Sequence, residues 1–240
     1  MEPALPDRSN DHDDPMVLVI EDDPDVREGL RALFESVNLQ SKTFGSAPEF
    51  LRCKLPEKVS CLILDVRLPG LSGLDFQTEL AKVQIDIPII FITGHGDIPM
   101  SVKAMKAGAV EFLVKPLREQ DLLDAVRAAL ERDRRRRQHD MLTHDLRTRF
   151  ATLSSREKEV MALVATGLMN KQVAAEIGVS EITVKVHRHN LMKKLDAKSL
   201  AELVRMADTV GLPHRMYMPN GPSDGDLKRQ VMSETEKVSA

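Results

Sequence analysis

Four apolar runs in this chain end in residues whose side chains can do phosphoryl chemistry. The first run ends at Glu21 and Asp22, the second at Asp65, the third at Thr93 and the fourth at Lys115. Continuous apolar runs are typical of parallel strands covered on both faces, and function gathers at the carboxyl ends of such strands. Neighbouring carboxylates repel each other unless a cation lies among them, and a set of ligands that are all oxygen atoms suits Mg²⁺. The hydroxyl group of Thr93 and the ammonium group of Lys115 suit a phosphoryl group.

A second group of reactive side chains lies on one predicted helix, at residues 180–194. Its buried stripe follows the helical period and consists of Val184, His187, Leu191 and Leu195. Another face offers donors and a methyl group, which suit phosphates and base edges in a major groove. This face carries Lys185, Val186, His189 and Lys193, with Arg188 beside it. Single-stranded nucleic acid is disfavoured because Phe150 is the only Phe, Tyr or Trp between 131 and 212.

The elements that position the first group alternate between strands and helices. The apolar runs predict strands near 17–20, 41–44, 61–64, 87–92 and 111–114. Helical periods lie between and after them, near 25–37, 47–55, 72–83, 98–107 and 119–137. Five strands alternating with five helices predict an α/β fold, a doubly wound five-stranded parallel sheet over residues 16–130.

The second half of the chain predicts a small all-α domain. Residues 131–137 have no apolar face and are interpreted as the exposed end of the fifth helix, which runs into a linker over residues 131–150. Four helices follow within 151–212. Ser154 with Glu157, and Ser199 with Glu202, fit capping boxes. Gly178 suits a left-handed helix end, and the Gly-Val-Ser turn that it begins fits a helix-turn-helix.

The net charge of −3 hides an asymmetry between these halves. Residues 1–130 carry 14 Lys/Arg against 22 Asp/Glu, a net charge of −8, whereas residues 131–212 carry 16 against 11, a net charge of +5. The imbalance suggests that one half binds a cation and the other a polyanion, although two ordinary solvated surfaces would look the same. The polar ends, an acidic arm over 1–15 and a tail over 213–240, are predicted to be disordered.

Composition narrows the class of protein further. Apolar residues make up 42% of the chain, which excludes collagen and wholesale disorder, and two cysteines exclude a disulfide scaffold. Both cysteines are interpreted as packed thiols in a reducing cytoplasm. The longest apolar run, residues 160–165, is too short to span a bilayer, so no membrane association is expected.

The segment Leu64-Asp65-Val66-Arg67-Leu68-Pro69-Gly70-Leu71-Ser72-Gly73 resembles the phosphoacceptor segment of response-regulator receiver domains. The spacings of 43 residues from Asp22 to Asp65 and 50 from Asp65 to Lys115 agree with that family. The resemblance implies a flavodoxin-like fold in which Asp65 accepts the phosphoryl group, Thr93 and Lys115 bind it, and Lys115-Pro116 is a cis bond. It also implies a Mg²⁺ site formed by Glu21, Asp22, Asp65 and the carbonyl of Arg67, and a switch pair, Thr93 and Phe112.

Residues 153–195 resemble the LuxR-type helix-turn-helix, through Leu153-Ser154-Ser155-Arg156-Glu157, Asn170-Lys171 and Thr183-Val184-Lys185-Val186-His187. The resemblance implies base contacts from Lys185, Val186 and His189, and phosphate contacts from Lys171, Arg188 and Lys193. Together the halves are similar to response regulators of the FixJ/NarL type. Tight DNA binding should need a dimer, for which the helix over 199–210, with Leu200, Leu203, Val204 and Ala207 on one side, is the expected pairing element.

These features predict a phosphorylation-activated transcriptional regulator of a two-component system. Its expected partners are a sensor histidine kinase, double-stranded promoter DNA and a second copy of the chain, with RNA polymerase as a further candidate. It is not expected to be an enzyme, beyond slow loss of its own phosphoryl group. One alternative is a phosphorelay or interaction protein that does not bind DNA. Another is an enzyme, a kinase or phosphatase, that uses Asp65 catalytically. Residues 144–148 also look like the histidine box of sensor kinases, which would make the chain a hybrid phosphotransfer protein.

Overall fold

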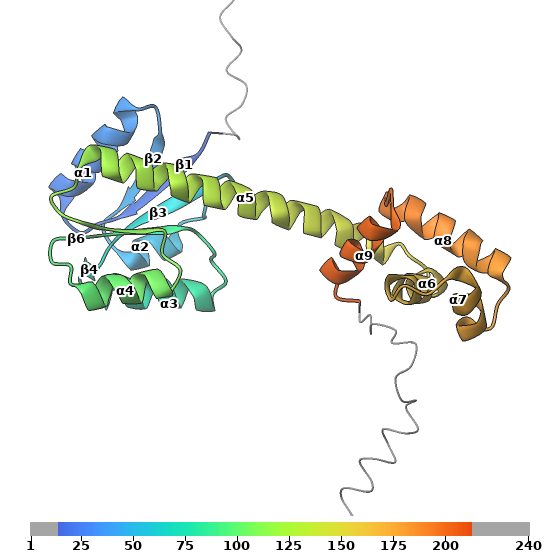
Figure 1. Cartoon of the computed structure of the whole chain (residues 1–240). Helices are drawn as coiled ribbons and strands as arrows, with labels where there is room; N and C mark the ends of the chain where they lie inside the picture. Colours follow the sequence, from blue (N-terminus) through green and yellow to red (C-terminus); the bar gives the residue numbers. More distant parts are fainter. Residues whose placement is uncertain (1–13, 213–240) are drawn as a thin grey trace, which may run out of the picture. The chain divides into compact units, whose positions relative to one another are not determined.

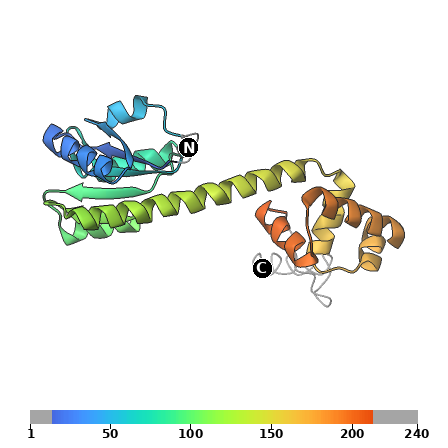
Figure 2. The same ribbon diagram turned by 90° about the horizontal axis from the view of Figure 1, so that it is seen from above.

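A computed structural model describes residues 14–212 (Figures 1 and 2). These residues belong to two compact units, and the boundary between the units along the chain lies between Asp140 and Met141. The predicted tail over 213–240, and the predicted arm over 1–15 except its last two residues, lie outside the described part. Between residues 14 and 212, no helix is long and apolar enough to cross a membrane.

The first unit contains the predicted parallel sheet, with strand order β2-β1-β3-β6-β7 (Figure 1). Its strands are β1 (Met16–Ile20), β2 (Gln40–Phe44), β3 (Ser60–Asp65), β6 (Ile89–Thr93) and β7 (Glu111–Val114). The helices are α1 (Pro24–Ser36), α2 (Ala47–Arg52), α3 (Gly73–Lys82), α4 (Ile98–Lys106) and α5 (Glu119–Ala151). A short antiparallel pair, β4 (Arg67–Leu68) and β5 (Leu71–Ser72), was not predicted because two residues are too few to show a period.

Two apolar cores, one on each face of the sheet, explain why the strands are continuously apolar. In β3, Leu62 and Leu64 pack with Phe50 and Phe76 from α2 and α3. The alternate residues of the same strand pack in the second core, with side chains of α1 and α5, among them Phe34 and Val126. Every residue of β3 is buried. The sheet is therefore covered on both sides, as the sequence pattern predicted.

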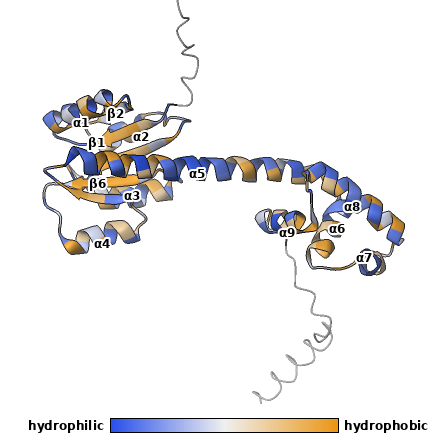
Figure 3. Cartoon of the chain, turned by 45° about the horizontal axis from the view of Figure 1, so that its top comes forward, coloured by the Kyte–Doolittle hydropathy of each residue, from blue (hydrophilic) through white to orange (hydrophobic). Residues whose placement is uncertain are grey.

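Helix α5 is longer and more firmly attached than predicted. It continues unbroken to Ala151, and its arginine-rich middle is hydrophilic (Figure 3). The prediction that residues 131–137 are simply exposed is wrong, since Asp133 is 0% exposed. Its carboxylate accepts hydrogen bonds from the backbone N–H of Ser60 at 2.9 Å, from Arg136 Nη2 at 2.6 Å and from Arg137 Nε at 2.7 Å. Two cations spaced three and four residues away balance its charge, which allows a charged residue to be buried.

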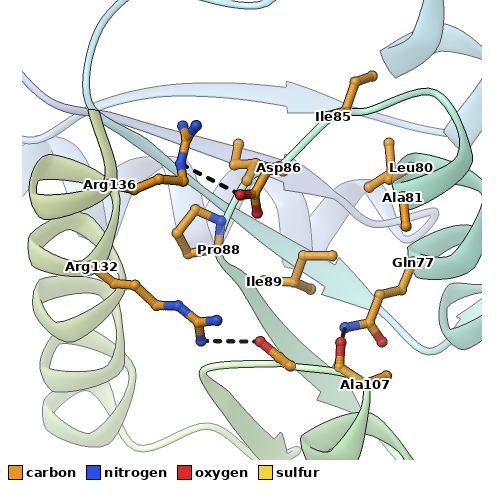
Figure 4. A pocket seen from close by; sticks show the side chains of 12 residues that line it. Gln77, Leu80, Ala81, Ile85, Asp86, Pro88, Ile89, Ala107, Arg132 and Arg136 are labelled. Atoms are coloured by element: carbon orange, nitrogen blue, oxygen red, sulfur yellow. Dashed lines mark hydrogen bonds and ion pairs between the residues drawn. The ribbon is translucent and has the colours of Figure 1, made fainter. Parts of the chain in front are cut away.

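Other side chains attach α5 to the loops at this end of the sheet, opposite to the Asp65 end. Arg132 Nη1 donates to the carbonyl of Gly108 at 3.1 Å, and Arg137 Nη2 to that of Pro56 at 3.5 Å. Figure 4 shows Arg132 and Arg136 projecting from α5 over a pocket that Gln77 and Asp86 also line. The helix is therefore held to the first unit by polar contacts that continue beyond Leu130, its last residue in that unit's apolar core.

We expect Asp133→Ala to lower the free energy of unfolding by about 3 kcal/mol, because it leaves the Ser60 N–H and two arginines without their buried partner. Urea denaturation of the full chain, followed by circular dichroism, measures this. Asp124→Ala is the matched control, since Asp124 lies on the same helix, is exposed and pairs only at the surface, with Arg127 and Gln120. Its effect should stay within about 0.5 kcal/mol. Equal losses in the two variants would contradict this account of Asp133.

The second unit contains four further helices, α6 (Ser155–Ala165), α7 (Asn170–Ile177), α8 (Glu181–Leu195) and α9 (Leu200–Thr209). The capping box of Ser154 and Glu157 is complete, and Gly178 has a φ of 70° at the end of α7. The box predicted at α9 is only half formed. Ser199 accepts from the N–H of Glu202, but the Glu202 carboxylate accepts from Lys198.

The core of this unit corrects one expectation about dimer formation. In α8, Val184, Leu191 and Leu195 are fully buried, as predicted, while His187 is half-buried. In α9, however, Leu203 and Ala207 belong to the same core and are fully buried. Two of the four residues expected to pair copies of the chain are therefore used within one copy. Their spacing could not distinguish a partner helix from the unit's own core.

Candidate phosphoryl site and DNA-binding face

The structure brings Glu21, Asp22 and Asp65 together at the carboxyl ends of β1 and β3. The two strands pair in register up to Ile20 and Leu64, so the residues that follow stand side by side. One carboxylate oxygen from each of the three residues lies within 4.8 Å of the other two. Glu21 is 1% exposed and Asp65 5%, whereas Asp22 is exposed. Oxygen ligands with one open side suit Mg²⁺, and this set fits that ion.

Lys115 reaches the same place from the end of β7. Its Nζ donates to Asp65 Oδ2 at 2.7 Å and to Glu21 Oε2 at 2.6 Å. The backbone joins it to Thr93, because the Lys115 N–H donates to the Thr93 carbonyl at 2.8 Å. Thr93 is fully buried, and the Lys115-Pro116 bond is cis, as the receiver resemblance implied. All the residues predicted for phosphoryl chemistry thus stand at one edge of the sheet.

The electrostatics of this pocket follow from burial and pairing. Burial raises the pKa of Glu21, and the hydrogen bond from Lys115 only partly offsets this effect. For Lys115, burial lowers the pKa, but the hydrogen bonds and charges of Asp65 and Glu21 outweigh burial, so the pKa is raised. The lysine therefore stays charged and compensates only part of the negative charge. A divalent cation among the carboxylates would compensate more of it.

Several local contacts fix the loops of the pocket. The Arg67 N–H donates to Asp65 Oδ1 at 2.8 Å and holds that carboxylate in position. Asp23 caps α1 by accepting from the N–H groups of Asp25 and Val26, and it is not part of the acidic cluster. Sequence analysis missed Arg27. Its Nη1 donates to the carbonyls of Glu21 and Asp22, both at 2.7 Å, and nothing in the sequence around Arg27 signals this contact.

The proposed switch residues lie against one common neighbour. A methyl group built on Gly96 would lie 2.9 Å from Phe112 Cε1 and 3.1 Å from Thr93 Cγ2. The ring of Phe112 is half-buried, with its centroid 6.3 Å from that of Phe91. Thr93 and the ring of Phe112 therefore both border Gly96.

In the second unit, the residues predicted to contact DNA gather on α8 and at the start of α7. Lys171, Lys185, Val186, His189 and Lys193 are exposed. Lys185 Nζ forms an ion pair with Glu181 at 3.0 Å. Arg188 is half-buried and its Nη1 donates to Asn170 Oδ1 at 3.1 Å, and its phosphate contact stays a prediction.

An ion pair between a buried carboxylate and an exposed lysine supports the position of α8. Glu157, at the start of α6, accepts from Lys194 Nζ at 2.7 Å. Burial by itself would raise the pKa of Glu157, but the bonds from Lys194 and Ser154 outweigh it, and the pKa lies below its usual value. The capping box at α6 therefore also attaches the C-terminal turn of α8.

Comparison with known proteins matches both units. The profile of the response regulator receiver domain matches residues 17–127, and that of the bacterial regulatory proteins of the luxR family matches residues 151–207. Nodulation protein W of Bradyrhizobium diazoefficiens is 62% identical over 197 residues, which are 82% of this chain and 87% of the relative. The chain belongs to the response regulators with a LuxR-type DNA-binding domain.

Other relatives of this response regulator carry related names. Transcriptional regulatory protein FixJ of Azorhizobium caulinodans is 42% identical over 196 residues, covering 82% of this chain and 93% of that protein. The solved structure of the response regulator StyR superposes on this chain with a TM-score of 0.71. The two sequences are 50% identical, and the match covers 81% of this chain and 98% of StyR. The response regulator is thus a two-component regulator of transcription that binds DNA, and its predicted fold class is confirmed.

One glycine of this response regulator must stay small for the site to form. A Cβ on Gly73 would lie 2.4 Å from the backbone carbonyl oxygen of Asp65, far closer than atoms approach in proteins. We expect Gly73→Ala to displace Asp65 and to slow phosphorylation by acetyl phosphate and Mg²⁺ at least tenfold, measured on Phos-tag gels. Gly94→Ala is the control, because a Cβ there meets nothing within 4 Å. Comparable rates in the two variants would show that the close approach at Gly73 does not matter.

Proposed function

We propose that Asp65 is the phosphoacceptor of this response regulator and that a sensor histidine kinase is the donor. The observation that carries the proposal is the buried Asp65 carboxylate, held between Lys115 and the Arg67 N–H beside two further carboxylates. A carboxylate oxygen of Asp65 attacks the phosphorus of a phosphohistidine. The N–P bond breaks, an acyl phosphate forms on Asp65, and the imidazole leaves.

The other residues of the pocket bind and orient the transferred group. Glu21, Asp22, Asp65 and the backbone carbonyl of Arg67 would hold Mg²⁺, which supplies positive charge as the phosphoryl group transfers. Lys115 already contacts Asp65 and would pair with a phosphoryl oxygen, and Thr93 Oγ1 would donate to another. The site accepts one group per activation, so we infer no enzymatic turnover beyond slow self-dephosphorylation.

Phosphorylation would be transmitted through Thr93 and Phe112 to the surface formed by α4 and β7. This surface exposes large apolar side chains, namely Ile98, Val102, Met105 and Val114. Exposed apolar residues that gather in one region mark a protein contact. We propose that a second copy of the chain covers them in the phosphorylated state, so that two DNA-binding units engage two half-sites.

On DNA, Lys185, Val186 and His189 would contact base edges, and Lys171, Arg188 and Lys193 would contact phosphates. Their exposure on α7 and α8 supports this division, with Arg188 first released from Asn170 or bonding from its present place. The setting we propose is the cytoplasm, with RNA polymerase as a partner at the promoter. The alternative of a phosphorelay protein that does not bind DNA lacks support from the LuxR-family match.

Footprinting the purified chain on its candidate promoters, with and without Mg²⁺ and acetyl phosphate, tests the proposed function. We expect the phosphodonor to strengthen protection in the wild type and to have no effect on Asp65→Asn, because the amide cannot accept the phosphoryl group. Phosphorylation without any DNA affinity at low salt would contradict a regulator of transcription. Acid-labile phosphate on His144 instead of Asp65 would support the kinase alternative.

The division between base and phosphate contacts has its own test. We expect Lys185→Ala and His189→Ala to relax the preference among sites, since each removes a base contact. Lys193→Ala should weaken binding to all sequences and reduce the salt slope by about one, since it removes a phosphate contact. Fluorescence anisotropy on a preferred and a scrambled duplex over a range of salt concentrations measures both effects. Uniform loss in all three variants would contradict the division.

A further inference from the structure

The recognition helix carries two aliphatic side chains where folding needs none. Ile182 is 74% exposed and Val186 53%, whereas Val184 between them is fully buried. Val184, Leu191 and Leu195 mark the side of α8 that faces the core. With about 100° of rotation per residue, the line directly opposite passes through Ile182, Val186, His189 and Lys193. This line, which points away from the core, begins with two branched aliphatic residues and ends with a histidine and a lysine.

Neither aliphatic residue benefits the isolated domain. An exposed isoleucine or valine buries little apolar area, and β-branched residues are poorer helix formers than alanine. Their neighbours on α8 are polar, namely Glu181, Thr183, Lys185 and His189. Ile182 and Val186 are four residues apart and therefore adjacent on the helix surface. Together they form a small apolar patch surrounded by groups that can hydrogen-bond.

The position of the patch indicates what it contacts. In helix-turn-helix proteins the N-terminal residues of the recognition helix reach the base edges of the major groove. Ile182 is the second residue of α8, two residues after the Ser180 cap. The apolar feature that a major groove offers is the 5-methyl group of thymine. Lysines and histidine on the same face would meet phosphates and acceptor atoms, which leaves the thymine methyl groups for the patch.

We propose that Ile182, together with Val186, reads thymine through its 5-methyl group and so helps to set the operator sequence. This inference rests on the proposed DNA-binding function and adds to it a residue, Ile182, that the motif comparison did not identify. Removal of one methyl contact corresponds to about a fourfold change in affinity.

Uracil substitution provides the test, because uracil differs from thymine only by lacking this methyl group. The full chain, activated with beryllofluoride and Mg²⁺, first selects its preferred duplex from a random pool. Each thymine of the selected half-site is then replaced by uracil in turn. We expect about fourfold weaker binding by the wild type at one or two positions. Ile182→Ala should bind the thymine duplex about that much more weakly and show no further loss with uracil at its position.

Val83→Ala is the matched control, because Val83 is also an exposed aliphatic residue, at 59%, and caps the end of α3 in the receiver. It should keep the full uracil penalty. Thermal unfolding should show that Ile182→Ala is as stable as the wild type, since it removes no buried contact. DNA binding with no uracil penalty in the wild type, or an unchanged penalty in Ile182→Ala at every position, would overturn this inference alone. Failure to select any duplex would overturn the proposed DNA contacts as well.

Discussion

Compensation of negative charge at the carboxyl edge of the sheet is the constraint on which the rest of the receiver depends. Parallel pairing of β1 with β3 forces Glu21 and Asp65 together, and the two carboxylates would repel each other without a neighbouring cation. Lys115 supplies one positive charge from the end of β7. Arg27 and the Arg67 N–H hold the surrounding loops in place. The negative charge that remains uncompensated suits the divalent ion and the phosphoryl group of the proposed function.

The same principle recurs at the opposite edge of the sheet. Asp133 is buried against the first residue of β3, and two arginines from its own helix compensate its charge. Strand β3 therefore carries the proposed phosphoacceptor at one end and contacts α5 at the other. That helix continues into the second unit without a break. Both edges of the receiver are thus organised by buried carboxylates, whose charge is balanced by two arginines at Asp133 and only in part by Lys115 at Asp65.

In the second unit, apolar packing and helix capping do most of the positioning. The capping box of α6 extends into an ion pair between the buried Glu157 and the exposed Lys194, so the recognition helix is fixed at its C-terminal end. Its N-terminal end, with Ile182 and Val186, stays exposed. A rigid helix with one exposed face suits the recognition of base edges in the major groove, because the side chains on that face keep a constant spacing.

The sequence by itself determined the order of strands and helices and the residues at the carboxyl edge, because hydrophobic period and strand ends are local properties. It also determined the helix caps of Ser154 and Gly178 and the exposed face of α8. Only the tertiary structure decided the roles of Arg27, Asp133 and Arg188, whose partners depend on how distant segments pack. It likewise placed Leu203 and Ala207 in the core, because an apolar stripe shows that a face is covered but not what covers it.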